Sequence, residues 1–479
     1  MKSEEILAIY NKGPEAVIEI IQKQNEEIQA LKEIVKQLTL RVQELEARLN
    51  QNSSNSNRPP SSDGLSRKDR RTKERKSKKK RGGQKGHEGS QLKMSTHPDK
   101  VLVHSVEKCG RCDCSLSGAP VKIDKRQVID TPEIKTEVTE HRAEIKGCPH
   151  CGFITKASFP EGVTRPVQYG SRIKGLLTYL SQYQLIPYDR IAEFCGDILG
   201  IRMSTGTIYN ANRQAYEASD PVEESIKNLL AQEPVLHADE TGVFCGGMLK
   251  WQHVLSTDRL TYYSVHEKRG KGAIDDMGII PGYRGRLMHD FWSPYLAYDC
   301  DHAFCNAHLI RELTSIDENY QQSWACEMIE LLVSIKKHAD ARLNRLNEST
   351  VKGYAKHYDR IIAKGIKANP HPPSMAGCRG RKKKPKPLNL LMRMKNYKRE
   401  ILSFMYDVTI PFDNNQAERD LRMVKVQQKI SGCFRSSEGG MFFARIRGYI
   451  STVKKNGVPV FGALQGLFEN RPFMPQSAE

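Results

Sequence analysis

EPVLHADETG, residues 233–242, reads as a short apolar strand that ends in an acid, Asp239. Two further runs, residues 250–256 and 260–265, also have strand character and are separated by a turn. Three strands in such quick succession predict a meander. The sequence therefore predicts a sheet-containing domain with Asp239 at the end of its first strand.

Two more acids occupy similar positions further along the chain. RLMHD predicts a second short strand that ends in Asp290, because the FWSP that follows breaks the pattern. FDNNQAERDLR, residues 412–422, predicts a helix that begins at Asp413 or Asn414 and presents Glu418.

Three carboxylates from two strand ends and a helix suit two hard divalent cations. Mg²⁺ and Mn²⁺ prefer oxygen ligands, and two such ions about 4 Å apart stabilise the entering and leaving oxygens of a phosphodiester displacement. The sequence therefore predicts a catalytic site in which Asp239, Asp290 and Glu418 hold two Mg²⁺ or Mn²⁺ ions. Surface or capping roles for the two aspartates are the alternative. Arg422 and Lys425 share the helix face of Glu418 and are candidates for binding DNA phosphates; an ordinary solvated basic face is the alternative.

The charge of the chain points to a polyanionic partner. Its 479 residues include 75 Lys and Arg against 56 Asp and Glu, which gives a formal net charge of +19. Much of this surplus lies in two basic runs, with twelve Lys or Arg in residues 67–85 and six in residues 379–386. Such runs favour binding to the backbone of double-stranded DNA, with a solvated linker as the alternative.

The composition excludes a membrane protein. Hydrophobic residues make up 38% of the chain, and no run of eighteen apolar residues is present to cross a bilayer. The first residues mix acids and bases, unlike a signal peptide. We therefore expect a cytoplasmic, nucleoid-associated protein without a membrane partner.

Residues 17–49 carry an apolar seam with heptad spacing. One heptad position holds Ile21, Ile28, Val35, Val42 and Leu49, and the other holds Leu31, Leu38 and Leu45. β-Branched residues at the first position and leucine at the second favour a parallel two-stranded coiled coil, so we expect a homodimer or a higher assembly. An amphipathic helix packed on its own domain is the alternative. The helix should end near Asn50, where a stretch rich in Ser, Asn and Pro begins.

Two CxxC pairs predict a structural zinc site. Cys109 and Cys112 form the first pair, and Cys148 and Cys151 form the second. Each short turn places two thiolates on one side of an ion, and together the pairs complete a tetrahedron. Cys114 is a competing ligand, and chance pairs of buried thiols are the alternative. The segment between the pairs alternates apolar and polar residues, which predicts strands of a small antiparallel sheet.

A helical segment follows the predicted zinc domain. Three helical patterns occupy residues 171–218, and Ser204, Thr205 and Thr207 are suitable caps for the last of them. This order is typical of a helix-turn-helix whose second helix enters the major groove. A helical hairpin that braces the next domain is the alternative.

Cys300, His302, Cys305 and His308 place four possible metal ligands within nine residues. Their spacing is too tight for a usual zinc finger, and the residues after Cys305 have a helical pattern, so we favour a structural or substrate-positioning role over a second zinc site.

Taken together, these motifs resemble the bacterial transposases of the insertion-sequence-66 family over nearly the full length of the chain. The most specific pieces are HADETG around Asp239, HDFWSPY around Asp290, CNAHLIREL from Cys305 and NNQAERDLRMVKVQQKISG around Glu418. The resemblance implies an N-terminal leucine zipper, a zinc-finger domain, a helical segment and a ribonuclease-H-like nuclease of the Asp-Asp-Glu type. Its catalytic acids would be Asp239, Asp290 and Glu418.

The expected fold class is therefore multidomain α/β, with a helical insertion in the ribonuclease-H-like catalytic core. The expected parts are a coiled-coil helix at 1–50, a flexible basic linker at 51–100, a zinc-binding domain at 101–165, a helical segment at 166–230, a catalytic core at 231–305 and 400–455, a helical insertion with a basic Pro/Lys-rich loop at 306–399, and a C-terminal tail at 456–479.

The implied function is a DNA transposase that cleaves the ends of an insertion sequence and joins them to target DNA by two-metal-ion hydrolysis and transesterification. The resemblance also implies accessory proteins as partners. Two alternatives remain: a non-catalytic DNA-binding regulator, and a ribonuclease-H-like nuclease that cuts without joining.

Overall fold

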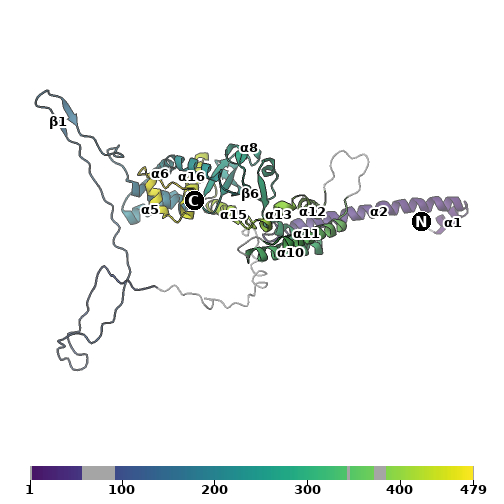
Figure 1. The fold of residues 1–479 in the computed structure, drawn as a ribbon, viewed down its shortest axis with the longest axis horizontal. Coiled ribbons are helices and arrows are strands. Elements are labelled where there is room, and N and C mark those ends of the chain that lie inside the picture. The colour runs from purple at the N-terminus through teal and green to yellow at the C-terminus, as the bar shows by residue number, and fades with distance from the viewer. Residues whose placement is uncertain (1–2, 57–91, 342–345, 372–383, 478–479) are drawn as a thin grey trace. The chain divides into compact units, whose positions relative to one another are not determined.

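The computed structural model describes residues 3–56, 92–341, 346–371 and 384–477. The basic run at 67–85 and most of the run at 379–386 lie outside these described residues. The chain forms two compact units (Figure 1). The larger comprises residues 1–63, 163–192 and 203–479, and the smaller comprises residues 64–162 and 193–202.

A mixed five-stranded sheet forms the centre of the larger unit. Its strands are β3 (Val235–Cys245), β4 (Met248–Ser256), β5 (Thr261–His266), β6 (Arg286–His289) and β7 (Asp301–Phe304). The strand order is β5-β4-β3-β6-β7, with antiparallel pairing from β5 to β3 and parallel pairing from β3 to β7. The predicted meander and the strand before Asp290 are confirmed, whereas β7 was not predicted. The prediction that Asp239 ends its strand is wrong, because β3 continues to Cys245 in its pairing with β4.

Helices cover both faces and one edge of this sheet (Figure 1). On one face, α15 (Asn415–Ser431) buries Ala417, Leu421 and Val424 against β3, β4 and β5. At the β5 edge, α16 (Ser437–Lys455) runs beside the last strand, and a Cβ at Gly448 would lie 3.1 Å from the carbonyl oxygen of Thr261. Glycine therefore allows the close approach that protects this edge from pairing with another chain.

The other face carries the largest core cluster. Residues of β3, β4 and β5 pack there with α7 (Asp220–Leu230), α8 (Lys271–Asp276) and the inner side of α16. Two short 3₁₀ turns, Ile280–Gly282 and Ser293–Ala297, complete this side.

A separate helical cluster interrupts the sheet domain between β7 and α15. Its helices are α9 (Asn306–Tyr320), α10 (Ser323–Asp340), α11 (Glu348–Ala368), α12 (Lys386–Asn396), α13 (Lys398–Ile401) and α14 (Ser403–Tyr406). They share one apolar core that includes Trp324 and Tyr358. The helical insertion is present as expected, but Ile401 and Phe404 also belong to it, beyond the predicted boundary at residue 399.

The N-terminal part of the chain is helical, with α1 (Ser3–Tyr10) and α2 (Pro14–Leu49). Asn50 caps the end of α2, as the sequence indicates. The heptad positions of α2, such as Ile28 and Leu38, are exposed in the single chain. Just beyond α2, the side chain of Asn55 donates a hydrogen bond of 2.7 Å to Glu318 of α9. The pairing of α2 with a second chain stays a prediction.

Four short helices precede the sheet or follow it: α4 (Ser171–Thr178), α5 (Tyr188–Leu199), α6 (Thr205–Ala218) and α17 (Val460–Leu467). A π-helical turn, Tyr179–Tyr183, extends α4. Ser204 caps α6, since its side chain accepts the backbone N–H of Thr207. The tyrosines of α6, Tyr209 and Tyr216, pack against Phe442 of α16 with tilted rings, so this helix braces the sheet domain. Whether α6 also enters a DNA groove stays a prediction.

The predicted C-terminal tail is partly wrong. Ala463, Leu464 and Leu467 of α17 are buried in the core cluster of the sheet domain, and Gly175 of α4 lies against the backbone of Gln465. An amphipathic segment of eight residues folds here because its apolar side chains find an existing core.

In the smaller unit, β1 (Ile145–Gly147) and β2 (Ile154–Lys156) form an antiparallel hairpin. The described residues from 116 to 144 contain no strand, so the prediction of strands throughout this segment is wrong. Its apolar side chains, including Val121 and Val128, are exposed. Alternation alone does not form a sheet when no layer covers its apolar side.

Candidate functional site

Asp239 and Asp290 lie on neighbouring strands at matched positions. The parallel register pairs His237 of β3 with Met288 of β6, and each acid follows two residues later. Neighbouring strands are about 4.8 Å apart, so this register brings the two aspartates to one edge of the β3–β6 pair.

Glu418 lies on α15, the helix that covers one face of the sheet. It lies in the first turn of α15, which packs on the sheet through Ala417 and Leu421. Burial raises the pKa of Asp239 well above its usual range, and the negative charges of Glu240, Asp290 and Glu418 raise it further. The charges of Asp290 and Glu418 thus both act on Asp239, but among the described residues the three acids do not form one group with ligand atoms within 4.8 Å of one another. Their joint binding of metal ions stays a prediction.

Asn414 connects the segments that carry these acids. Its side-chain oxygen lies 2.8 Å from Nδ1 of His237, and its amide nitrogen donates to the carbonyl oxygen of Ala238 at 2.8 Å. Its backbone N–H donates to the sulfur of Cys305 at 3.1 Å. Asn414 begins α15 as predicted, but its buried side chain binds β3 and makes no side-chain capping bond. Sequence reasoning missed this role because a capping asparagine and a cross-linking asparagine have the same local pattern.

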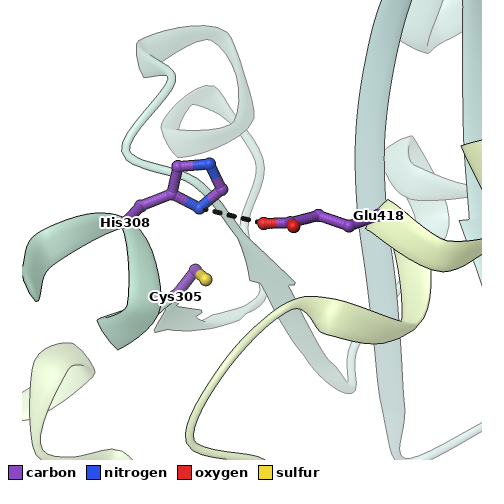
Figure 2. A group of neighbouring side chains, drawn as sticks. All are labelled: Cys305, His308 and Glu418. Carbon is purple, nitrogen blue, oxygen red and sulfur yellow. Dashed lines mark ion pairs between the residues drawn. The ribbon is translucent and has the colours of Figure 1, made fainter. Parts of the chain in front are cut away.

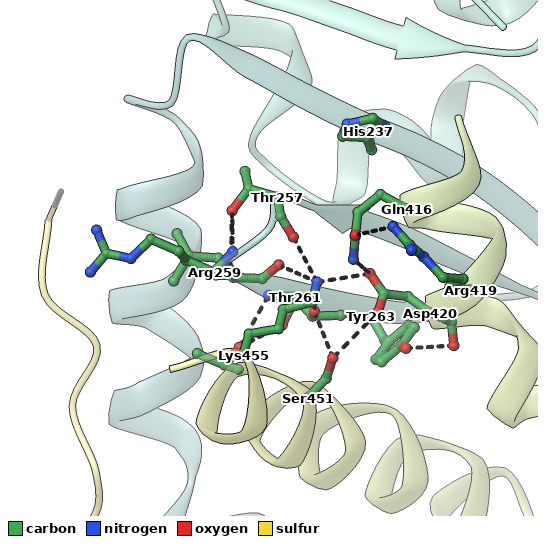
Figure 3. A network of polar contacts seen from close by, with 12 residues as sticks. His237, Thr257, Arg259, Thr261, Tyr263, Gln416, Arg419, Asp420, Ser451 and Lys455 are labelled. Carbon is green, nitrogen blue, oxygen red and sulfur yellow. Dashed lines mark hydrogen bonds and ion pairs between the residues drawn. The ribbon is translucent and has the colours of Figure 1, made fainter. Parts of the chain in front are cut away.

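A buried ion pair fixes the next turn of α15 (Figure 3). The ammonium group of Lys455 donates to Asp420 at 2.8 Å and to Thr261 Oγ1 at 2.6 Å. The hydroxyl of Tyr263 donates to the backbone carbonyl of Asp420 at 2.8 Å. These bonds hold α15 against β5 and α16 and limit how far Glu418 can move.

The residue after Asp239 organises a basic and aromatic group beside the acids. Glu240 points to the opposite face of β3 and accepts two bonds from Arg269, at 3.0 and 2.6 Å. Arg269 lies between Trp251 and Trp292, with its guanidinium carbon 4.9 and 4.4 Å from their ring centres. Burial and the charge of Asp290 raise the pKa of Glu240, while Arg269 lowers it. This group was not predicted.

A second donor cluster includes Glu418 (Figure 2). Ligand atoms of Cys305, His308 and Glu418 all lie within 4.8 Å of one another. His308 Nδ1 is 3.6 Å from Glu418 Oε1, and Arg311 is 3.6 Å from the other carboxylate oxygen. Burial lowers the pKa of His308, which favours the neutral ring, and raises the pKa of Cys305 to about 12.

The four-residue Cys and His group of the sequence does not stay together. Cys300 packs against the core cluster of the sheet domain. His302 Nδ1 lies 3.1 Å from Nε2 of the buried His289. His302 lies within β7, and Cys305 and His308, which follow this strand, are the two members of the group that lie near Glu418.

Comparison with known families fits this arrangement. The model of the transposase IS66 family matches residues 166–442, which include the sheet, the helical insertion and all three acids. The chain belongs to the IS66 family of transposases. A second model, of a family of unknown function named DUF6444, matches residues 13–93. None of the curated proteins matches the chain.

Membership in this family makes the chain a DNA transposase, which implies DNA binding and dependence on divalent metal ions. No helix among the described residues of the transposase is long and apolar enough to cross a membrane.

Two predicted DNA-binding residues lie further along α15 of the transposase. Arg422 is exposed on this helix. Lys425 is bound by the protein itself, since its ammonium group donates to the carbonyl oxygen of Gly242 at 2.9 Å and to Gln428 at 3.2 Å. Burial lowers the pKa of Lys425. Of the two, Arg422 is better placed to reach a DNA phosphate.

Each predicted zinc knuckle of the transposase forms a tight turn. Cys148 and Cys151 lie in the β1–β2 turn, where Gly152 donates its N–H to the carbonyl oxygen of Cys148. Backbone N–H groups within each turn lower the pKa values of Cys109 and Cys148, as in a site that favours thiolates. Among the described residues, the two pairs are not gathered into one group of metal ligands. Zinc binding by Cys109, Cys112, Cys148 and Cys151 stays a prediction.

Proposed function

We propose that this transposase is of the Asp-Asp-Glu type, with a ribonuclease-H-like core in which Asp239, Asp290 and Glu418 hold two Mg²⁺ or Mn²⁺ ions. It would cleave the ends of an insertion sequence and join them to target DNA. The observation that supports this most strongly is the parallel register of β3 and β6, which places Asp239 and Asp290 at one edge of this strand pair. The raised pKa of Asp239, to which the charges of Asp290 and Glu418 contribute, agrees with it. The mixed sheet, with two antiparallel and two parallel strand pairings, supports the fold assignment.

The donor set fits hard divalent cations. All three side chains offer oxygen atoms, which Mg²⁺ prefers, and they come from two strands and a helix that are separately anchored. Several carboxylates held together in a partly buried place repel one another, and bound cations would remove that cost. The contacts of Asn414 and Lys455 keep α15 in place. A shift of this helix that would move Glu418 away from the other carboxylates is therefore opposed.

When bound, such ions activate a water molecule or a hydroxyl and stabilise the leaving oxygen of the phosphodiester. Hydrolysis would break one P–O bond at an element end and release a 3′-hydroxyl. In joining, that hydroxyl would attack a target phosphodiester, so that one P–O bond forms while another breaks. Neither step needs a covalent bond to the protein.

Basic side chains of the chain itself would position the DNA strand. Arg269 is held by Glu240 and by two tryptophans, and 39% of its side chain remains exposed. A planar guanidinium fixed in this way binds a phosphate with little further loss of freedom. Arg422 would add a contact from α15.

The remaining parts would bring two DNA ends together. The exposed heptad seam of α2 supports a dimer through a coiled coil. The zinc-binding unit, the helical segment around α6 and the basic linker would grip the element ends, and accessory proteins would act with them. Several weak contacts on one chain add avidity that no single contact has.

A joining assay tests this proposal. Full-length protein with Asp239→Asn should lose cleavage and joining of DNA ends in Mg²⁺ by at least about 100-fold, since a neutral amide cannot replace an anionic metal ligand. Asp299→Asn is the matched control, because this side chain is fully exposed and precedes the start of β7, whereas Asp290 follows the end of the parallel neighbouring strand β6. Pre-cut ends distinguish a transposase from a nuclease that only cuts.

Wild-type activity in the Asp239→Asn protein would refute the catalytic assignment. If the protein cleaves DNA ends but forms no joined product from pre-cut ends, it is a nuclease and the joining step of the proposal is wrong.

A further inference from the structure

Cys305, His308 and Glu418 form a compact donor cluster whose sulfur, nitrogen and oxygen come from separate places in the chain (Figure 2). Cys305 follows β7 and lies at the start of α9, His308 lies one turn into that helix, and Glu418 lies on α15. The cluster therefore joins the helical insertion to the sheet domain.

Two atoms of this cluster are buried without a hydrogen-bond partner among the described residues. They are Nδ1 of His308 and Oε1 of Glu418. Their separation of 3.6 Å exceeds the usual length of a hydrogen bond, which is about 2.7 to 3.2 Å. A buried polar atom left unpaired costs roughly 1 to 3 kcal/mol. Two such atoms next to each other therefore indicate a bound group that pairs with both.

The spacing of the two atoms suits an ion between them. Zinc binds histidine nitrogen at about 2.0 to 2.1 Å and carboxylate oxygen at about 2.0 to 2.2 Å. An ion at these distances from both atoms spans a separation of 3.6 Å without moving either side chain far. The other carboxylate oxygen faces Arg311, which leaves Oε1 for the ion.

The backbone holds the sulfur of Cys305 in a fixed position. Cys305 accepts the backbone N–H of Asn414 at 3.1 Å and lies at the N-terminus of α9. Bonds of this kind orient metal ligands in proteins. Burial raises the pKa of the free thiol, so a bound metal ion would displace its proton.

We propose that Cys305, His308 and Glu418 form a binding site for a transition-metal dication of the Zn²⁺ class, distinct from the Mg²⁺ site and from the CxxC pairs. One thiolate, one imidazole and one carboxylate select zinc over magnesium, since magnesium binds oxygen ligands. Three protein ligands leave a fourth position for water or for a group of the DNA.

This site has a consequence that rests on the proposed function. Glu418 belongs to both donor sets, so an ion on Cys305 and His308 would take one carboxylate oxygen away from the catalytic ions. Zinc bound here would therefore hold Glu418 in an arrangement that opposes catalysis, and its binding is independent of whether Asp239 is catalytic.

Metal content of the full-length protein tests the site directly. After zinc loading and removal of weakly bound metal, His308→Asn and Cys305→Ser should each retain one equivalent of zinc less than wild type. Cys326→Ser is the matched control, because this exposed cysteine lies on α10 outside the cluster. In cobalt-loaded protein, the intensity of the thiolate-to-cobalt charge-transfer absorption should decrease in Cys305→Ser by the contribution of one thiolate–cobalt bond. It should remain unchanged in Cys326→Ser.

Equal zinc content in wild type and His308→Asn would overturn the proposal, even if the buried Cys305→Ser protein fails to fold. Asp239→Asn separates the two proposals. If this variant keeps the extra equivalent and loses joining, both stand; if it keeps joining, the catalytic assignment is wrong while the zinc site stands.

Discussion

At the scale of the residue, the surroundings of Asp239 disfavour the ionised form of its carboxyl group. Burial raises its pKa, and the charges of Glu240, Asp290 and Glu418 act in the same direction. A carboxyl whose pKa is raised in the folded state destabilises the fold once it ionises, so stability is lost as pH rises from the unfolded value of about 3.9 through the folded one. Functional sites commonly lower the stability of the fold in this way.

This cost gives a stability prediction for Asp239→Asn. In chelator at pH 8, the variant should unfold at a temperature at least about 2 °C higher than wild type, because the substitution removes an unfavourable ionised group. Saturating Mg²⁺ should raise the unfolding temperature of wild type more than that of the variant. Scanning calorimetry of both proteins, with Asp299→Asn as the exposed control, measures the two differences. A less stable variant in chelator would contradict the electrostatic account of this position.

At the scale of the element, the site depends on how α15 is held against β3. Helix α15 begins at Asn414, whose buried side chain contacts His237 and the backbone of Ala238. One turn later, the carboxylate of Glu418 lies near His308 and Arg311 of α9. The orientation of the third acid is therefore set by contacts at the beginning of its helix.

Asn414→Ala tests this element. The substitution leaves His237 Nδ1 and the Ala238 carbonyl without these partners, which should lower the free energy of unfolding by about 2 to 4 kcal/mol. It should also reduce the rate of joining at saturating DNA by roughly tenfold or more, with a smaller change in DNA affinity, because Glu418 is displaced while the DNA contacts remain.

Asn415→Ala is the control for this experiment, since Asn415 is the exposed neighbour. Chemical denaturation and single-turnover joining measure the two effects. If Asn414→Ala and Asn415→Ala joined DNA equally fast, Asn414 would have no part in positioning Glu418.

The sequence predicted those elements whose signal is local. The strand-like runs at 250–256 and 260–265 predict the meander, and the capping pattern around Asn414 predicts the start of α15. The contacts of Asn414 with β3 and the sharing of Glu418 with Cys305 could not be predicted, because they join residues more than a hundred positions apart. Strand β7 was missed because four residues give too little pattern to recognise.

At the scale of the whole molecule, one catalytic domain is interrupted by a helical insertion that carries part of its site. Cys305 and His308 lie where the insertion begins, and Glu418 lies just after it ends. The insertion has its own apolar core and also contacts the residues that follow α2. Changes in the insertion can therefore reach Glu418 through α9 without passing through the sheet.

The central claim is that three acids from β3, β6 and α15 hold the catalytic ions. Anomalous diffraction from crystals of the full-length protein with a bound DNA end and Mn²⁺ tests it most directly. We predict two manganese peaks, roughly 4 Å apart, with Asp239, Asp290 and Glu418 as their protein ligands. Manganese bound by other residues, with Glu418 directed away from the two aspartates, would contradict the account.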